Sequence, residues 1–308
     1  MIGTFFLACF LMVSGALGAD GDPVDVNTVY GPVRGVEEYG VDTFKGIPYA
    51  KPPVGELRWA APQAPDVWTN TVVCTNYSAG CPQIPMEWVS PDVTDEDCLY
   101  LNVWAKKGAT NLPVMVWMYG GGFYAGGSSL PSYDGTFLAL KDVLVVSFNY
   151  RLGVLGFLMT EELYATEGAA VGNAGLMDQI FALKWVRDNI AAFGGDPDNV
   201  TLFGHSAGAA SVSHMLVAPQ AKGLFHKAIC QSGSVPSNPF ECDNGAWSNA
   251  MAKGQALMDT LGVSSLDELR MVPASNVVEG ADYLLNNYWL HYGPMMDGEL
   301  VRSDFRTL

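Results

Sequence analysis

Two glycine-bearing segments of this 308-residue chain have the residue types needed for attack on a carbonyl group. The first reads Gly204-His205-Ser206-Ala207-Gly208 and follows an apolar run. Its serine between glycines is the pattern of a nucleophile elbow, a sharp strand-to-helix turn that exposes a hydroxyl. The second, residues 119–127, reads YGGGFYAGG. Three consecutive glycines leave backbone amides free to face a developing oxyanion. The alternative for each segment is a plain tight turn.

Apolar segments in strand–helix alternation surround these two motifs. Three segments, residues 99–105, 114–119 and 143–150, are rich in β-branched and aromatic residues and apolar on both faces, as central strands covered by helices are. A fourth strand, residues 200–204, leads into the serine, and small residues behind it allow a helix to pack closely. The pattern predicts an α/β fold with a central sheet.

Segments outside this strand–helix alternation also predict secondary structure. Gly31-Pro32 lies between two extended runs and predicts a hairpin at a sheet edge. A helix is expected from Asp178, with polar Lys184, Arg187 and Asp188 on one arc. Two late segments, MAKGQALMDTLG and SLDELRMV, are expected to form helices outside the sheet.

The net charge and the N-terminal sequence indicate which partners and which compartment fit this protein. The chain has 32 acidic and 16 basic residues, a net charge of −16, which argues against a nucleic-acid or anionic-membrane partner. Its apolar run from Ile2 to Val13 is too short to span a bilayer comfortably, and Ala16-Leu17-Gly18 has small residues at the two positions that signal peptidase recognises. We expect a cleaved signal peptide at residues 1–18, a mature domain over 19–308, and a secreted, extracellular protein.

Secretion changes how the cysteines and asparagines are interpreted. Six cysteines become five if Cys9 leaves with the signal peptide, so at least one is free or bonded to another molecule. Cys230 is the expected free thiol, buried in a short strand. Asn76 and Asn199 match the glycosylation sequon, and Asn199, beside a buried strand, is also readable as a chance match.

Beyond the two motifs, the chain resembles the type B carboxylesterase and cholinesterase family of α/β-hydrolases. The resemblance runs from Phe44 to Val301 through FKGIPYAKPPVGELRW, EDCLYLNVW, PVMVWMYGGGFYAGGSS, VVSFNYRLGVLGF, the long segment around the serine, AICQSGS and PMMDGELV. It implies an α/β-hydrolase fold, with a mostly parallel central sheet and helices on both faces. It also implies a serine ester hydrolase that forms an acyl-enzyme and needs no metal or organic cofactor.

The family pattern, transferred residue by residue, assigns roles to this chain's own positions. Ser206 would be the nucleophile, and the amides of Gly121, Gly122 and Ala207 would form the oxyanion hole. Cys81 and Cys98 would form a disulfide, and two ion pairs, Arg58 with Glu96 and Arg151 with Asp178, would be structural. Substrate-binding candidates are Trp88, Tyr124, Tyr133, His205 and Phe240.

Several positions depart from the family pattern. His205 stands where glutamate is most common, which argues against a true acetylcholinesterase. Trp88 either stacks on a quaternary ammonium group or simply packs in its loop. The family's second disulfide is missing, so Cys74 and Cys242 have no assigned partners. Nothing selects the ester or the oligomeric state: short acyl chains, a hormone ester and a xenobiotic ester all fit.

The acid and the histidine that a catalytic serine needs have no clear candidates in this sequence. In this fold the chain order is serine, acid, histidine, and the family places both partners beyond PMMDGELV. His214, His226 and His291 are expected to be structural. We therefore expect a chain that stops before its triad is complete, is inactive alone, and leaves the strand at KAICQSG near an edge beside uncovered apolar surface. The alternative is an inactive adhesion or binding ectodomain, but the retained serine and glycines favour an enzyme.

Overall fold

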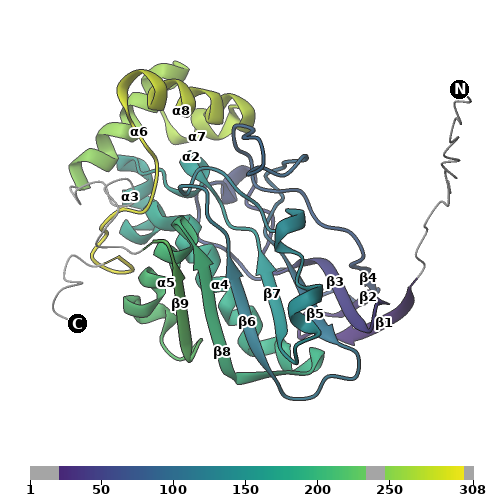
Figure 1. Cartoon of the computed structure of the whole chain (residues 1–308). Coiled ribbons are helices and arrows are strands. Elements are labelled where there is room, and N and C mark those ends of the chain that lie inside the picture. Colours follow the sequence, from purple (N-terminus) through teal and green to yellow (C-terminus); the bar gives the residue numbers. More distant parts are fainter. Residues whose placement is uncertain (1–20, 234–246, 302–308) are drawn as a thin grey trace, which may run out of the picture.

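The computed structural model describes residues 21–233 and 247–301, and a mixed sheet forms its centre (Figure 1). The predicted signal peptide, Phe240 and Cys242 lie outside these residues. The strands are β1 (Asp22–Asn27), β2 (Pro32–Glu38), β3 (Val41–Pro48), β4 (Val72–Val73), β5 (Tyr100–Lys106), β6 (Leu112–Met118), β7 (Leu144–Phe148), β8 (Gly195–His205) and β9 (Lys227–Gln231). Their order is β1-β2-β3-β5-β7-β6-β8-β9, with β4 beside β2.

The two halves of the sheet differ in strand direction. β1, β2, β3, β5 and β7 pair antiparallel in turn, and the first pair is the hairpin predicted at Gly31-Pro32. β7, β6, β8 and β9 are parallel, so their carboxyl ends meet at one edge. The expected mostly parallel sheet is therefore found in the half that carries the serine, and the N-terminal half is antiparallel except for the short β4, which pairs parallel with β2.

Helices cover both faces of the sheet, as predicted. Those beside the sheet are α1 (Thr136–Ala139), α4 (Ala174–Asn189) and α5 (Ala207–Val217). α4 and α5 lie behind the parallel strands in Figure 1, and α1 packs on β5 and β7 from the other side. α4 begins at Ala174, before the predicted start at Asp178, because its first turn, with Ala174, Gly175 and Leu176 buried, has no polar start signal.

A second group of helices lies over the carboxyl ends of the parallel strands (Figure 1). It contains α2 (Gly153–Gly156), α3 (Glu161–Glu167), α6 (Trp247–Leu261), α7 (Leu266–Met271) and α8 (Ala274–Tyr288). α6 and α7 match the two helices predicted outside the sheet. α8 was not predicted, although Val277, Ala281 and Leu284 form a buried stripe at helical spacing. Short 3₁₀ turns lie elsewhere along the chain, at Gly55–Leu57, Pro131–Tyr133, Ala169–Asn173, Ile190–Phe193 and Pro219–Ala221.

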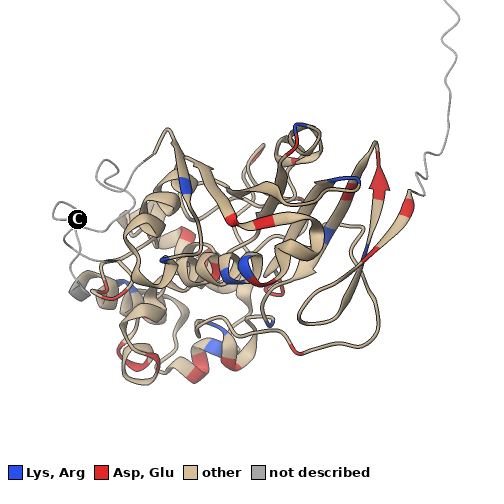
Figure 2. Cartoon of the chain, turned by 90° about the horizontal axis from the view of Figure 1, so that it is seen from below, with Lys and Arg blue, Asp and Glu red and all other residues tan. Residues whose placement is uncertain are grey.

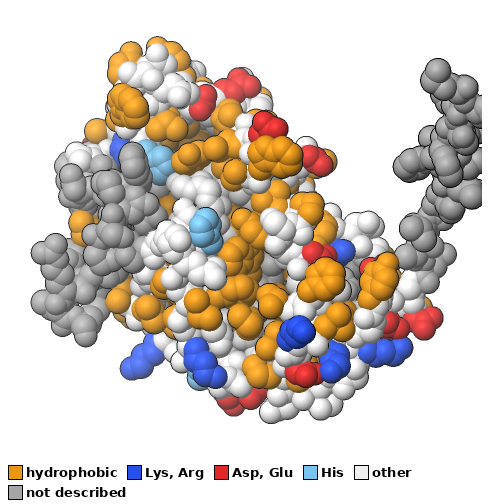
Figure 3. Space-filling model, in the orientation of Figure 1, with side chains coloured by type: hydrophobic (Ala, Val, Ile, Leu, Met, Phe, Trp, Pro, Cys, Tyr) orange, Lys and Arg blue, Asp and Glu red, His pale blue; other side chains and the backbone are white. Residues whose placement is uncertain are grey.

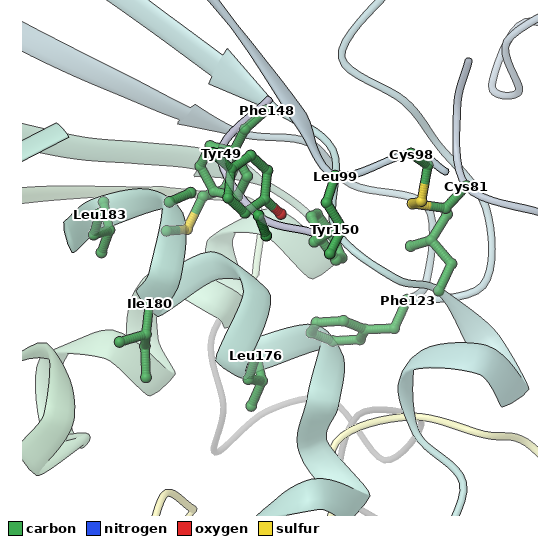
Figure 4. Packing of buried hydrophobic residues seen from close by; sticks show 14 of the residues in the cluster. Tyr49, Cys81, Cys98, Leu99, Phe123, Phe148, Tyr150, Leu176, Ile180 and Leu183 are labelled. Carbon is green, nitrogen blue, oxygen red and sulfur yellow. A yellow bond between two sulfur atoms is a disulfide. The ribbon is translucent and has the colours of Figure 1, made fainter. Parts of the chain in front are cut away.

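The core lies between the sheet and α4 (Figure 4). Leu176, Ile180 and Leu183 of α4 belong to the same buried hydrophobic cluster as Tyr49 and Phe148. The rings of Tyr119 and Tyr150 stack with centroids 4.5 Å apart, and the Tyr150 hydroxyl donates to the Tyr119 carbonyl oxygen at 2.9 Å. The residues that follow the central strands are thus fixed by packing and by hydrogen bonds.

The opposite face of the parallel half is partly uncovered. Met115, Trp117 and Phe203 are half-buried, and Figure 3 shows hydrophobic side chains running down the middle of this face. All five residues of β9 are exposed, and Ile229 is 44% exposed. The expected edge position of this strand and the uncovered apolar surface are both present in the described residues.

Cys230 corrects one prediction. It is a free thiol, but it is exposed rather than buried. A strand residue is buried only when further elements pack on it, and β9 is the outermost strand of the described sheet. The Ser213 hydroxyl on α5 lies 3.6 Å from its sulfur. The buried free thiol is instead Cys74, whose pKa burial raises to about 12.

Acidic residues are spread over strands, loops and helices in Figure 2. Within the described ranges, no helix combines the length and the apolar character needed to cross a bilayer. The same residues hold no cluster of three or more His, Cys, Asp or Glu side chains suited to a metal ion.

Candidate functional site

Ser206 occupies the sharp turn between β8 and α5. Its backbone has φ 56° and ψ −122°, a conformation that residues other than glycine rarely adopt. The Ser206 amide donates to the Gln231 carbonyl oxygen on β9 at 2.9 Å, and its own carbonyl oxygen accepts from the Ala210 amide at 3.0 Å. The predicted elbow is therefore present, at the edge where the carboxyl ends of the parallel strands meet.

The two flanking glycines allow β8, α5 and β6 to approach this closely. A Cβ at Gly204 would lie 2.5 Å from the carbonyl group of Gly208. A Cβ at Gly208 would lie 2.0 Å from the Met118 carbonyl oxygen, at the end of β6. Any side chain at either position would push the helix off the strands, as expected from the glycine pattern.

The second glycine segment passes directly beside the serine. A Cβ at Gly120 would lie 2.6 Å from the His205 carbonyl oxygen and 3.1 Å from the Ser206 Cβ. Gly121 and Gly122 follow with φ values of 120° and 62°, which favour glycine. The loop then folds back, because the amides of Tyr124 and Ala125 donate to the Gly121 carbonyl oxygen at 3.1 and 3.0 Å.

Within residues 21–233 and 247–301, the amides of Gly121, Gly122 and Ala207 are among those that have no acceptor. They are the amides predicted for the oxyanion hole. Free amides close to a nucleophilic serine can stabilise negative charge on an oxygen that forms there. The structure thus brings the predicted nucleophile and its predicted donors to one place.

His205, His214 and His226 do not pair with the Ser206 hydroxyl. His205 is exposed at the end of β8. His214 is buried in α5, and burial lowers its pKa to about 3. His226 accepts from the Val200 amide through Nδ1 at 3.1 Å. Among the residues that the structure describes, no histidine or carboxylate hydrogen-bonds to the Ser206 hydroxyl.

A small apolar cavity lies between the glycine segment and α8. Its volume is about 120 Å³, and its wall includes Tyr124, Ile84, Leu152, Leu285 and His291. Tyr124, a predicted substrate-binding residue, is 38% exposed and meets the His291 ring edge-on at 5.4 Å between centroids. An apolar group of a ligand held near the glycine loop would have space here.

The other predicted binding residues are more dispersed. Tyr133 is half-buried and packs on Trp117, with ring centroids 5.1 Å apart, on the partly uncovered face of the sheet. Trp88 is 88% exposed in a turn and does not line the apolar cavity. The structure does not bring Trp88 or Tyr133 to the cavity that Tyr124 lines.

The predicted scaffold pairs are present. Cys81 and Cys98 form a disulfide with Cα atoms 5.0 Å apart. Arg58 Nε donates to Glu96 at 2.7 Å and Arg151 Nε donates to Asp178 at 2.8 Å, each as part of a two-point ion pair. The Arg151–Asp178 pair is almost fully buried.

The two sequons differ in their surroundings. Asn76 is exposed in a loop. Asn199 is half-buried in β8, and its side-chain oxygen accepts from Lys227 Nζ at 2.6 Å. Asn76 therefore offers the more accessible acceptor, and glycosylation stays a prediction.

One residue of the site region was not predicted. Gln83, inside the disulfide loop, hydrogen-bonds to the backbone of Gly126 at the far end of the glycine segment. No local pattern marks a side chain that acts on a backbone 43 residues away. The sequence feature that could have drawn attention to Gln83 is its position two residues after Cys81, a cysteine of the predicted disulfide.

Comparison with known proteins agrees with this geometry. The model of the carboxylesterase family matches residues 22–307. The chain belongs to the carboxylesterase family. Two relatives of this carboxylesterase-family chain are a para-nitrobenzyl esterase of Bacillus subtilis, 46% identical over 91% of the chain and 58% of the relative, and a cholinesterase of Mus musculus, 39% identical over 99% and 54%.

Solved structures give the same result for the fold. A thermophilic para-nitrobenzyl esterase superposes with a TM-score of 0.82 at 43% identity, over 89% of this chain and 58% of that one. A carboxylesterase of Geobacillus stearothermophilus superposes with a TM-score of 0.81 at 42% identity, over 91% and 57%. This carboxylesterase-family chain spans between half and three fifths of the length of the Bacillus subtilis and Mus musculus relatives.

Proposed function

We propose that this protein is a serine carboxylic ester hydrolase with Ser206 as its nucleophile. The observation that carries the proposal is the contact between the two glycine motifs. The strained turn at Ser206 and the loop at Gly120 approach so closely that only glycine fits. Family membership and relatives described as esterases support the same function.

The reaction follows from the positions of these groups. The Ser206 hydroxyl attacks the ester carbonyl carbon, and the carbonyl oxygen becomes an oxyanion that accepts from the amides of Gly121, Gly122 and Ala207. Collapse of this intermediate expels the alcohol and leaves an acyl group on the serine. Water then attacks the acyl-enzyme and releases the carboxylic acid.

The base and acid of the triad are proposed to come from a part of the protein beyond Leu308. Two observations support this: no described side chain accepts from the Ser206 hydroxyl, and the chain covers only 58% and 54% of the length of two relatives. A serine without a base is a neutral alcohol and a poor nucleophile. We therefore expect residues 1–308 alone to show only residual ester hydrolysis.

We also propose a secreted protein. The apolar N-terminal run supports a cleaved signal peptide, and the Cys81–Cys98 disulfide fits an oxidising compartment. The apolar cavity beside Tyr124 supports an ester that carries a small apolar group.

Hydrolysis of p-nitrophenyl acetate by the full-length protein tests the proposal. Ser206→Ala should abolish turnover and labelling by a fluorophosphonate probe. Ser213→Ala on the same helix, whose hydroxyl only donates to the Ala209 carbonyl oxygen at 3.1 Å and faces Cys230, is the matched control and should keep both. Unchanged turnover in Ser206→Ala would remove this serine from the mechanism. Absence of labelling in the wild-type protein would favour the inactive binding ectodomain.

A further inference from the structure

The side chain of Gln83 lies at the junction of the disulfide loop and the glycine segment. It is 8% exposed, and every hydrogen-bonding position of its carboxamide is used. Nε2 donates to the carbonyl oxygens of Gly126 and Cys81 at 2.7 and 2.9 Å. Oε1 accepts from the Gly126 amide at 2.7 Å and from the Ser90 hydroxyl at 2.8 Å. One carboxamide therefore pairs with both backbone groups of a single glycine.

Gly126 closes the loop that carries the free amides. Its φ is 124°, and a Cβ there would lie 2.6 Å from the Gly120 carbonyl oxygen, so the two ends of the loop are in contact. Between them the chain turns around the Gly121 carbonyl oxygen. Since glycine is the residue least restricted in φ and ψ, a loop with four glycines needs an external restraint to hold its amides in one direction.

We propose that Gln83 is a positioning residue for the oxyanion hole: by clamping Gly126 it sets the direction of the Gly121 and Gly122 amides. This inference rests on the proposed function. The Cys81–Cys98 bridge anchors Gln83 from behind, because the carbonyl oxygen of Cys81 is one of its acceptors. The disulfide loop thus acts on the reaction through Gly126.

Two substitutions in the full-length protein separate positioning from simple folding. Gln83→Glu keeps the shape but places an oxygen against the carbonyl oxygens of Gly126 and Cys81. Gln83→Met keeps the length and removes all four hydrogen bonds. Ser90→Ala is the matched control, because it removes one bond to Gln83 and leaves both bonds to Gly126.

The expected signature is a split between kcat and KM on p-nitrophenyl acetate. Both Gln83 variants should lose about 10- to 100-fold in kcat, since misplaced donors weaken binding of the oxyanion and not of the ground-state ester. KM should change less than about threefold, and Ser90→Ala should resemble wild type. Affinity for a trifluoromethyl ketone, which forms an oxyanion on the serine, should fall in parallel with kcat/KM.

Hydrogen exchange on the wild-type protein gives a readout that does not depend on whether the variants fold. The Gly126 amide should be strongly protected, whereas the Gly121 and Gly122 amides, which have no described acceptor, should exchange quickly. Equal exchange at the three glycines would overturn the clamp. Unchanged kcat in both Gln83 variants, with Ser206→Ala inactive, would overturn the positioning role and leave the proposed function standing. An active Ser206→Ala would overturn the function and the role together.

Discussion

Replacing Gly208 with alanine tests how closely the first turn of α5 must approach the end of β6. The new Cβ would lie 2.0 Å from the Met118 carbonyl oxygen and 2.7 Å from its carbonyl carbon. Unbonded carbon atoms sit about 3.5–4.0 Å apart, so helix and strand must separate by about 1 Å or more. Both atoms belong to the backbone of a buried strand and cannot rotate away.

The sign of the effect follows from two opposing contributions. Alanine is more stable than glycine inside a helix by about 0.5–1 kcal/mol. Overpacking costs about 1–3 kcal/mol, and a rigid backbone neighbour places Gly208→Ala in the upper part of that range. We expect a net loss of about 1–2 kcal/mol in unfolding free energy. Because Ser206 and Ala207 move with the helix, kcat/KM should fall about 100-fold.

Gly280→Ala is the matched control for this prediction. Gly280 is also inside a helix, α8, but a Cβ there would first meet the Leu261 Cδ2 at 3.1 Å, the end of a flexible side chain. Denaturant unfolding and p-nitrophenyl acetate hydrolysis of both variants give the comparison. We expect Gly280→Ala to match or slightly exceed wild type in stability. The packing argument fails if Gly208→Ala shares the wild-type midpoint and kcat/KM.

Three further changes test the scaffold by denaturant unfolding. Removing both cysteines of the Cys81–Cys98 bridge, which closes a 17-residue separation, should lower the unfolding free energy by about 3 kcal/mol, and an unchanged midpoint would contradict the loop-closure argument. Asp178→Asn leaves a buried guanidinium unpaired and should cost about 3–5 kcal/mol, whereas Asp188→Asn, in a surface pair, should cost less than about 1 kcal/mol. Burial lowers the pKa of His214 from 6.5 to about 3, so below pH 6.5 the unfolded chain takes up a proton that the folded one refuses. Relative to His214→Gln, wild type should therefore lose up to about 1.4 kcal/mol per pH unit as pH falls toward 3, and parallel pH profiles would exclude this coupling.

The motifs around Ser206 could be predicted because their cause is local. Glycine is required at positions 204, 208 and 120 because the backbones there are in close contact. These glycines are part of the motifs themselves, so the motifs can be recognised from a few neighbouring residues. α8 was harder, because asparagines and a glycine lower its helix propensity, and its stability comes from a buried stripe that meets other helices.

The exposure of Cys230 on the edge strand β9 and the hydrogen bonds from Gln83 to Gly126 could not be predicted, and the reason differs from that for α8. A strand sequence such as that of β9 indicates apolar character but not whether another element packs on it, so Cys230 was wrongly expected to be buried. The bonds from Gln83 to Gly126 join two loops that meet only after the sheet has formed. Both features depend on contacts distant in sequence.

The hydrogen bond from the Ser206 amide to Gln231 ties the elbow to the outermost described strand. Just beyond β9, a Cβ at Gly233 would lie 2.3 Å from the Ser206 carbonyl oxygen, so the chain after this strand also presses on the turn. Outer strands open locally at lower free energy than central ones. Local opening of β9 therefore also moves the backbone of Ser206. A strand or partner that pairs along β9 would restrict the motion of Ser206 without contacting the serine itself.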